Sequence, residues 1–350
     1  MTASRSSFPT DRRTLLRKSS TLGIVAATGA LGAGAVVGAD VLARNATPSA
    51  SPTAGTDASS RRERLRERLK ARRAARGPQD YPTPDVTDVP YVANGTPQQM
   101  LDIYLPKTAN AAGTPVATTA GTLVPVVVWI HGGGWVGGGK RVVGVPYLLD
   151  DGYAIVSIDY RLLQDAMFPA QIVDANAALS WVWNHAAEYG FDRTRIVVGG
   201  GSAGGRSASL AGASANDHVA EFVADPDVKI AAVIDFFGGT EGEAAFEKNA
   251  RRKALIESKL TQEQIDAMLQ MIDVRTYVDA GDPPTLIVHG DEDTVVPVKE
   301  GQELAAAMQA AGVPVTFEMM QGRGHGMIHY QDEAVQTIVR SFLEDTLGPV

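Results

Sequence analysis

Seven consecutive apolar residues, Val124 to Ile130, are the feature that most constrains how this chain folds. The run reads VPVVVWI and shows no alternation of polar and apolar side chains. A strand of this composition is buried on both faces, as in a parallel sheet that helices cover on each side. The run therefore predicts a central strand with helices packed above and below it.

Further strand-like runs alternate with helical patterns over residues 81–350. We predict strands over 99–105, 124–130, 154–158, 195–199, 230–236, 285–288 and 315–319, and helices over 170–188, 299–311 and 333–347. Strands and helices in alternation indicate one α/β domain with a mostly parallel sheet. The polar, helix-forming stretch 240–280 is inserted between two of these strands, and such insertions commonly cap a pocket.

Charge is distributed unevenly along the chain. Residues 1–80 carry 15 Lys and Arg against 6 Asp and Glu, whereas residues 81–350 carry 17 against 34. An acidic domain repels nucleic-acid phosphates, so no nucleic-acid partner is expected. The chain contains no cysteine, which excludes disulfides, a thiolate nucleophile and a Cys-ligated metal site.

The N-terminus has the features of an export signal. Arg12 and Arg13 precede an uncharged Ala-, Gly- and Val-rich stretch over 21–39, and the small residues Val41 and Ala43 precede an expected cleavage site. This pattern resembles a twin-arginine (Tat) signal, so residues 1–43 are expected to direct export through the Tat machinery to the cell envelope or beyond. The alternative is an uncleaved membrane helix, because the run approaches the ~20 residues that span a bilayer.

Residues 44–80 are predicted to form a linker. The part 44–60 is rich in Ala, Ser, Thr and Pro and has too few large apolar side chains to fold. The part 61–76 carries nine basic and two acidic side chains. A solvated helix is the simplest interpretation of 61–76, and contact with the anionic cell envelope is the alternative.

Ser202 lies in the sequence GGSAG (200–204), between a predicted strand and a helical segment. Gly-X-Ser-X-Gly in this setting is typical of a nucleophilic serine. The glycines lack a Cβ, so the turn can be tight and the hydroxyl can project from it. On this motif alone, a structural glycine-rich turn is the alternative.

A second glycine-rich turn, HGGGW (131–135), follows the predicted strand 124–130. Backbone N–H groups of such a turn can stabilise the negative oxygen of a tetrahedral intermediate. We predict that N–H groups of this glycine run form an oxyanion hole together with that of Ala203, which follows the serine. Neither phosphate-binding glycine motif, Walker or G-x-G-x-x-G with a following acid, is present at this turn.

A serine nucleophile needs a base. The chain offers six histidines: His131, His185, His218, His289, His325 and His329. His325 lies in a glycine-rich loop between a late strand and the last helix, where an imidazole could reach Ser202. We therefore predict His325 as the base, with His329 as the alternative.

The base needs a carboxylate that orients it and stabilises the imidazolium. Three acids follow the predicted strand 285–288 on one turn. We predict Asp293 for this role, with Asp291 as the first alternative and Asp235 as the second. The resulting order of serine, acid and histidine along the chain is that of α/β-hydrolases.

Residues 85–348 resemble an α/β-hydrolase of the carboxylesterase type and are most similar to the HGGGW-containing esterases related to the BD-FAE group. The likeness also rests on IDYRL (158–162), FPAQ (168–171), Asp174 and Trp181. It implies a sheet of about eight strands flanked by helices. The resemblance implies Ser202 as nucleophile, Asp293 and His325 as its partners, and the backbone N–H groups of Gly132, Gly133 and Ala203 as oxyanion hole.

The function expected from these features is that of an exported serine carboxylesterase, which needs no metal or organic cofactor. By family analogy its substrates are short acyl esters, such as acetyl or feruloyl esters on polysaccharides. An amidase or peptidase of the same fold is the first alternative. The second is a non-catalytic protein that binds the cell envelope through residues 61–76.

Overall fold

The structure is a computed structural model that describes residues 81–106, 123–215, 219–240 and 250–350. The predicted signal (1–43) and the predicted linker (44–80), with its basic segment (61–76), lie outside the described residues. Within the described ranges, no helix combines the length and the hydropathy needed to cross a membrane.

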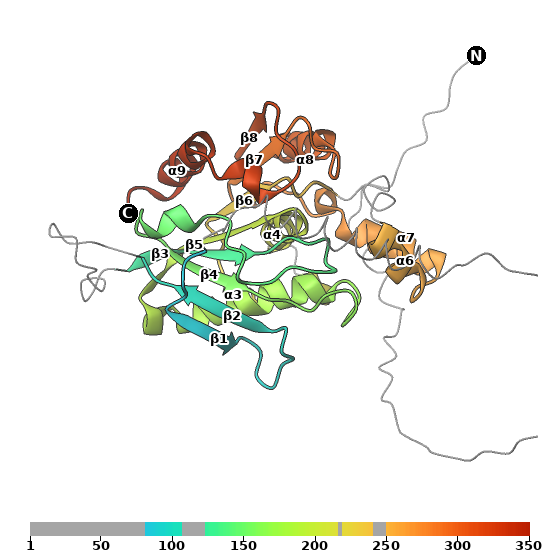
Figure 1. Cartoon of the computed structure of the whole chain (residues 1–350), viewed down its shortest axis with the longest axis horizontal. Coiled ribbons are helices and arrows are strands. Elements are labelled where there is room, and N and C mark those ends of the chain that lie inside the picture. Colours follow the sequence, from blue (N-terminus) through green and yellow to red (C-terminus); the bar gives the residue numbers. More distant parts are fainter. Residues whose placement is uncertain (1–80, 107–122, 216–218, 241–249) are drawn as a thin grey trace, which may run out of the picture. The chain divides into compact units, whose positions relative to one another are not determined.

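An eight-stranded sheet forms the centre of the described domain (Figure 1). Its strands are β1 (Val86–Pro90), β2 (Met100–Tyr104), β3 (Val124–Ile130), β4 (Ala154–Ile158), β5 (Phe191–Gly201), β6 (Ala232–Phe236), β7 (Thr285–Gly290) and β8 (Val315–Met320). They lie in the order β1-β2-β4-β3-β5-β6-β7-β8. Strand β2 is antiparallel to β1 and β4, and the other neighbouring pairs are parallel, which confirms the predicted α/β sheet.

Helices cover both faces of this sheet. They are α3 (Ala170–Tyr189), α4 (Ala203–Ser214), α6 (Ala250–Glu257), α7 (Gln262–Ile272), α8 (Val298–Ala311) and α9 (Glu333–Leu347), with 3-10 turns η1 (Pro146–Leu149), η2 (Ala220–Phe222), η3 (Val274–Thr276) and η4 (Met327–Tyr330). Buried side chains of α3, α4 and α8 belong to the core on one face, and those of η1 and α9 to the core on the other.

All seven residues of β3 are buried, as the apolar run predicts. Val126 and Val128 belong to the core that contains α3 and α4, whereas Val127 and Trp129 belong to the core that contains α9. Successive side chains of one strand point to opposite faces, so β3 contributes to both cores. Each large apolar side chain buried in this way stabilises the fold by about 1.5–3 kcal/mol relative to its exposure.

Two strands differ from the prediction by more than two residues. β5 begins at Phe191 and continues to Gly201, because Gly200 pairs with both neighbouring strands and Gly201 pairs with β6. The turn before α4 is therefore confined to Ser202. The sequence pattern did not predict β1, an edge strand in which three of the five residues are exposed.

The inserted stretch 240–280 carries α6, α7 and η3, although residues 241–249 lie outside the described residues. Helix α7 begins with a capping box between Thr261 and Gln264. Met268 and Ile272 of α7 line a small recess with Ile256 and Arg252 of α6 and with Trp135 and Phe168. Helices α6 and α7 therefore pack against Trp135 of the HGGGW turn.

Candidate active site

Ser202 forms a strained turn between β5 and α4. Its φ is 57° and its ψ is −123°, a backbone conformation that costs on the order of 1–3 kcal/mol in a residue other than glycine. The Ser202 N–H donates to the Phe236 carbonyl at 2.8 Å, and the Ser202 carbonyl accepts from the Arg206 N–H at 3.0 Å. Bonds to β6 and α4 thus hold the turn on both sides.

Gly204 allows α4 to pack closely on the sheet. A Cβ at this position would lie 2.0 Å from the Ile130 carbonyl oxygen of β3. No side chain fits without moving α4 away from the sheet, and α4 begins directly after Ser202. The glycine of the motif is therefore required by packing.

The structure brings Ser202, His325 and Asp293 together in one hydrogen-bonded chain. His325 Nε2 lies 2.8 Å from Ser202 Oγ, and His325 Nδ1 lies 2.7 Å from Asp293 Oδ2. With the proton on Nδ1, the imidazole donates to the carboxylate and presents Nε2 to the hydroxyl as an acceptor. This geometry allows His325 to remove the hydroxyl proton as the oxygen attacks an electrophile.

Asp293 is held by the loop that follows β7. Its Oδ1 accepts the N–H groups of Val295 at 2.8 Å and Val296 at 2.9 Å. Burial alone would raise the pKa of Asp293, but hydrogen bonds from His289 and His325 outweigh it and hold the pKa well below its ordinary value. The carboxylate is therefore ionised at neutral pH.

The alternative acids lie elsewhere. Asp291 accepts the Gly322 N–H and makes no hydrogen bond to His325 among the described residues. Asp235 is fully buried, where it accepts from Ser209 Oγ and from the Gly238 N–H, both at 2.7 Å. Burial raises the pKa of Asp235.

Phe237 supports the imidazole of His325. Its ring meets the His325 ring edge to face, with centroids 4.8 Å apart. Its backbone φ is 47°, and its N–H donates to the Val288 carbonyl of β7. Phe237 was not predicted as a site residue, because nothing in its local sequence indicates that the turn after β6 meets a loop almost ninety residues away.

The predicted oxyanion turn runs directly beside the serine. A Cβ on Gly132 would lie 3.4 Å from the Cβ of Ser202, and Gly133 has a φ of 128°. Ala203 is the first residue of α4, where backbone N–H groups have no partner within the helix. Gly132 therefore lies beside Ser202, and Ala203 follows the serine directly in the chain.

His131 and Trp135 anchor the two ends of this turn. The His131 ring stacks on Tyr160 with centroids 4.3 Å apart, and burial lowers its pKa, so the neutral ring donates from Nδ1 to the Gly132 carbonyl at 2.8 Å. Trp135 adopts a φ of 60° and donates from Nε1 to Ser207 Oγ at 3.2 Å. The turn is thus tied to Tyr160, which lies just after β4, and to Ser207 of α4.

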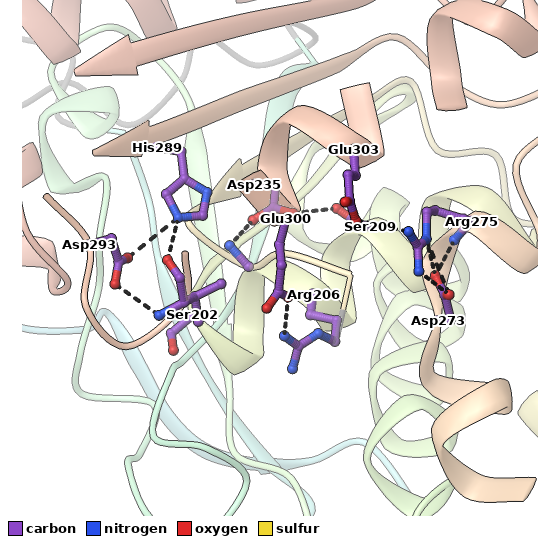
Figure 2. A network of polar contacts seen from close by, with 12 residues as sticks. Ser202, Arg206, Ser209, Asp235, Asp273, Arg275, His289, Asp293, Glu300 and Glu303 are labelled. Carbon is purple, nitrogen blue, oxygen red and sulfur yellow. Dashed lines mark hydrogen bonds and ion pairs between the residues drawn. The ribbon is translucent and has the colours of Figure 1, made fainter. Parts of the chain in front are cut away.

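Arg206 lies beneath this turn. It is 2% exposed, with its guanidinium 5.7 Å from the Trp135 ring centroid and 3.9 Å from Glu300 Oε2 (Figure 2). Burial, with the positive charge of Arg252, lowers the pKa of Arg206 to about 9, so it keeps its charge at neutral pH. Its contacts support Trp135.

Asp159 and Asp174, which belong to the motifs behind the family resemblance, have structural contacts. Asp174 is fully buried and pairs with Arg161 at 2.7 Å. Asp159 accepts the Lys140 N–H at 2.7 Å. Neither carboxylate joins the Ser202–His325–Asp293 chain.

A protein-family model described as BD-FAE matches residues 101–308. A second model, described as TAP-like protein, matches residues 269–350. Among curated proteins, Esterase LipC of Mycobacterium tuberculosis is 29% identical over 240 residues, covering 66% of this chain and 57% of the relative. The probable carboxylic ester hydrolase LipM of the same organism is 31% identical over 202 residues, covering 55% and 47%. The chain spans less than two thirds of the length of these curated relatives.

Solved structures show the same fold. A truncated carbohydrate esterase from gut microbiota superposes with a TM-score of 0.64 at 26% identity, covering 77% of this chain and 98% of that protein. Esterase B from Lactobacillus rhamnosis superposes with a TM-score of 0.65 at 24% identity, covering 82% and 95%. The described domain thus corresponds to nearly the whole of both solved chains.

Proposed function

Because the chain belongs to the BD-FAE family and has the α/β-hydrolase fold, we propose that it is an exported serine carboxylesterase acting on short acyl esters. The observation that carries this proposal is the chain of two hydrogen bonds from Ser202 through His325 to Asp293, beside a pre-organised oxyanion turn. The esterase names of the relatives support the same reaction class.

In the proposed reaction, Ser202 Oγ attacks the ester carbonyl while His325 Nε2 takes the hydroxyl proton. The carbonyl oxygen becomes an oxyanion, which is stabilised by the N–H groups of Gly132, Gly133 and Ala203. Asp293 stabilises the imidazolium that forms. When the tetrahedral intermediate collapses, the C–O bond to the alcohol breaks and His325 gives its proton to the departing oxygen, which leaves an acyl group on Ser202.

The second half of the reaction repeats these roles with water. His325 takes a proton from a water molecule, and the resulting hydroxide equivalent attacks the acyl carbonyl. The second intermediate collapses by breaking the bond to Ser202 Oγ, which takes back the proton from His325. The products are a carboxylic acid and the free serine.

The preference for short acyl groups rests on the likeness to the BD-FAE family. The solved relative at 26% identity is a carbohydrate esterase, which is consistent with an acyl group carried on a polysaccharide.

A series of p-nitrophenyl esters from acetate to palmitate tests this substrate class. We expect kcat/KM to be highest between acetate and butyrate and to fall by about tenfold or more for the longest chains, because a site that fits a short acyl chain discriminates against added methylenes. A maximum at palmitate would contradict the short-chain preference. Faster hydrolysis of p-nitroacetanilide than of p-nitrophenyl acetate would instead support an amidase.

We also propose that residues 1–43 export the folded enzyme by the Tat route. The support is Arg12 and Arg13 ahead of an uncharged, Gly- and Ala-rich stretch. In a bacterial host with a Tat system, we expect the wild-type chain outside the cytoplasm and the Arg12→Lys, Arg13→Lys double variant retained inside. Equal export of both chains would contradict this route.

A further inference from the structure

His289 is a buried histidine that the proposed reaction does not use. It lies in β7, four residues before Asp293, and its side chain has no exposed surface. Its Nε2 lies 2.9 Å from the Val296 carbonyl oxygen and 3.4 Å from Asp293 Oδ2. Figure 2 shows the imidazole directed at the Asp293 carboxylate.

The surroundings of His289 determine where its proton lies. Nε2 faces two acceptor oxygens, so it carries the hydrogen. Nδ1 has no hydrogen-bond partner among the described residues and faces Gly301 of α8, where a Cβ would come within 2.6 Å. A proton on Nδ1 would be buried without an acceptor, so the hydrogen is placed on Nε2. Its hydrogen bond goes to the Val296 carbonyl, and the same N–H lies beside Asp293 Oδ2.

The Asp293 carboxylate consequently receives donors on both oxygens. The N–H groups of Val295 and Val296 bind Oδ1, whereas His325 and His289 approach Oδ2. Val295 is 50% exposed, so one side of this loop faces solvent. The Nε2–H of His289 binds the loop backbone at Val296 and lies against the Asp293 carboxylate, so both meet the same buried ring.

We propose that His289 is a positioning residue that holds Oδ2 of Asp293 in line with Nδ1 of His325. The proposal rests on the proposed function, because it assigns a role within the same catalytic group. Without this N–H, the carboxylate keeps its two backbone bonds at Oδ1 but loses a constraint on its rotation. The imidazole of His325 would then spend less time oriented toward Ser202.

Two substitutions separate the hydrogen bond from the packing. His289→Leu removes the donor and keeps an apolar side chain, whereas His289→Gln can place an amide N–H close to the position of Nε2. Gly301→Ala keeps His289 in the sequence but displaces its ring, because the added Cβ would lie 2.6 Å from Nδ1. Leu304→Ala is the matched control, since Leu304 is a fully buried residue one turn along α8 without a polar group.

The readouts are kcat, KM, the melting temperature and the downfield proton resonance of the hydrogen bond between His325 and Asp293. We expect His289→Leu to lower kcat by about tenfold, the effect of losing one hydrogen bond to a charged group, with little change in KM. The downfield resonance should broaden or shift. His289→Gln should restore both kcat and the resonance, and Gly301→Ala should resemble His289→Leu. Leu304→Ala should lower only the melting temperature.

Wild-type kcat and an unchanged resonance in His289→Leu would overturn the proposal, whatever the melting temperature. Equal losses of kcat in His289→Leu and Leu304→Ala, with the resonance unchanged in both, would also overturn it. If His289→Leu does not fold, His289→Gln and Gly301→Ala decide by the same readouts. A wild-type protein without esterase activity would contradict the proposed function, while the resonance would still report whether His289 positions Asp293.

Discussion

Replacing Ser202 by alanine should lower kcat for p-nitrophenyl acetate by about 10⁴- to 10⁶-fold, the loss typical of removing a catalytic serine. In the proposed mechanism the hydroxyl is the group that attacks, and its removal leaves His325 and Asp293 without a nucleophile to activate. The KM should change little, because the hydroxyl contributes mainly to bond formation. The measurement is the initial rate of p-nitrophenol release by purified variant and wild type.

Ser214→Ala is the matched control for this prediction. Ser214 is also a buried serine of α4, but its hydroxyl donates only to the Leu210 carbonyl. Its replacement should leave kcat close to the wild-type value. Loss of the nucleophile should leave far less than about a hundredth of the wild-type kcat. If Ser202→Ala retained more than that fraction, the proposed mechanism would be wrong.

Replacing Gly133 by alanine should lower kcat by about 10²- to 10³-fold, the effect of losing one oxyanion donor. Gly133 has a φ of 128°, which side chains rarely permit, and a Cβ there would lie 2.0 Å from the Gly137 carbonyl oxygen. The turn would have to move, and its N–H groups would no longer meet at the oxyanion. The melting temperature should change little, because β3 ends before the turn and the central sheet is not disturbed.

Gly137→Ala provides the control in the same loop. A Cβ on Gly137 meets no atom within 4 Å, so this variant should keep both its kcat and its melting temperature. Comparable kcat losses in the Gly133 and Gly137 variants would show that general loop disturbance, rather than the oxyanion donors, explains the effect. An active Gly133→Ala enzyme would contradict the assignment of this turn.

The central sheet could be predicted from sequence because its signals are local. The run over β3 is apolar at every position, and all its residues are buried. The edge strand β1 could not be predicted in this way. It contains Asp88, whose φ is 55°, and three of its five residues are exposed, so it carries little hydrophobic pattern.

The structure brings together the predicted Ser202, Asp293 and His325, because each follows a strand in a recognisable turn. The contacts that support these residues were not predictable. Phe237 meets His325 only because the turns after β6 and β8 are neighbours in space. The role proposed for His289 depends on the distance between its Nε2 and Asp293 Oδ2 and on the close approach of Gly301 of α8 to its ring. Neither contact has a signature in a single sequence.

The most direct test of the account is to identify the residue that becomes covalently modified. A fluorophosphonate or an activated phosphonate ester reacts with a serine nucleophile and mimics the tetrahedral intermediate. Intact mass measurement followed by peptide mapping should find one adduct per chain, located on Ser202 and absent from Ser202→Ala. An unmodified Ser202 in a protein that still hydrolyses esters, or an adduct on another residue that abolishes hydrolysis, would contradict the central claim.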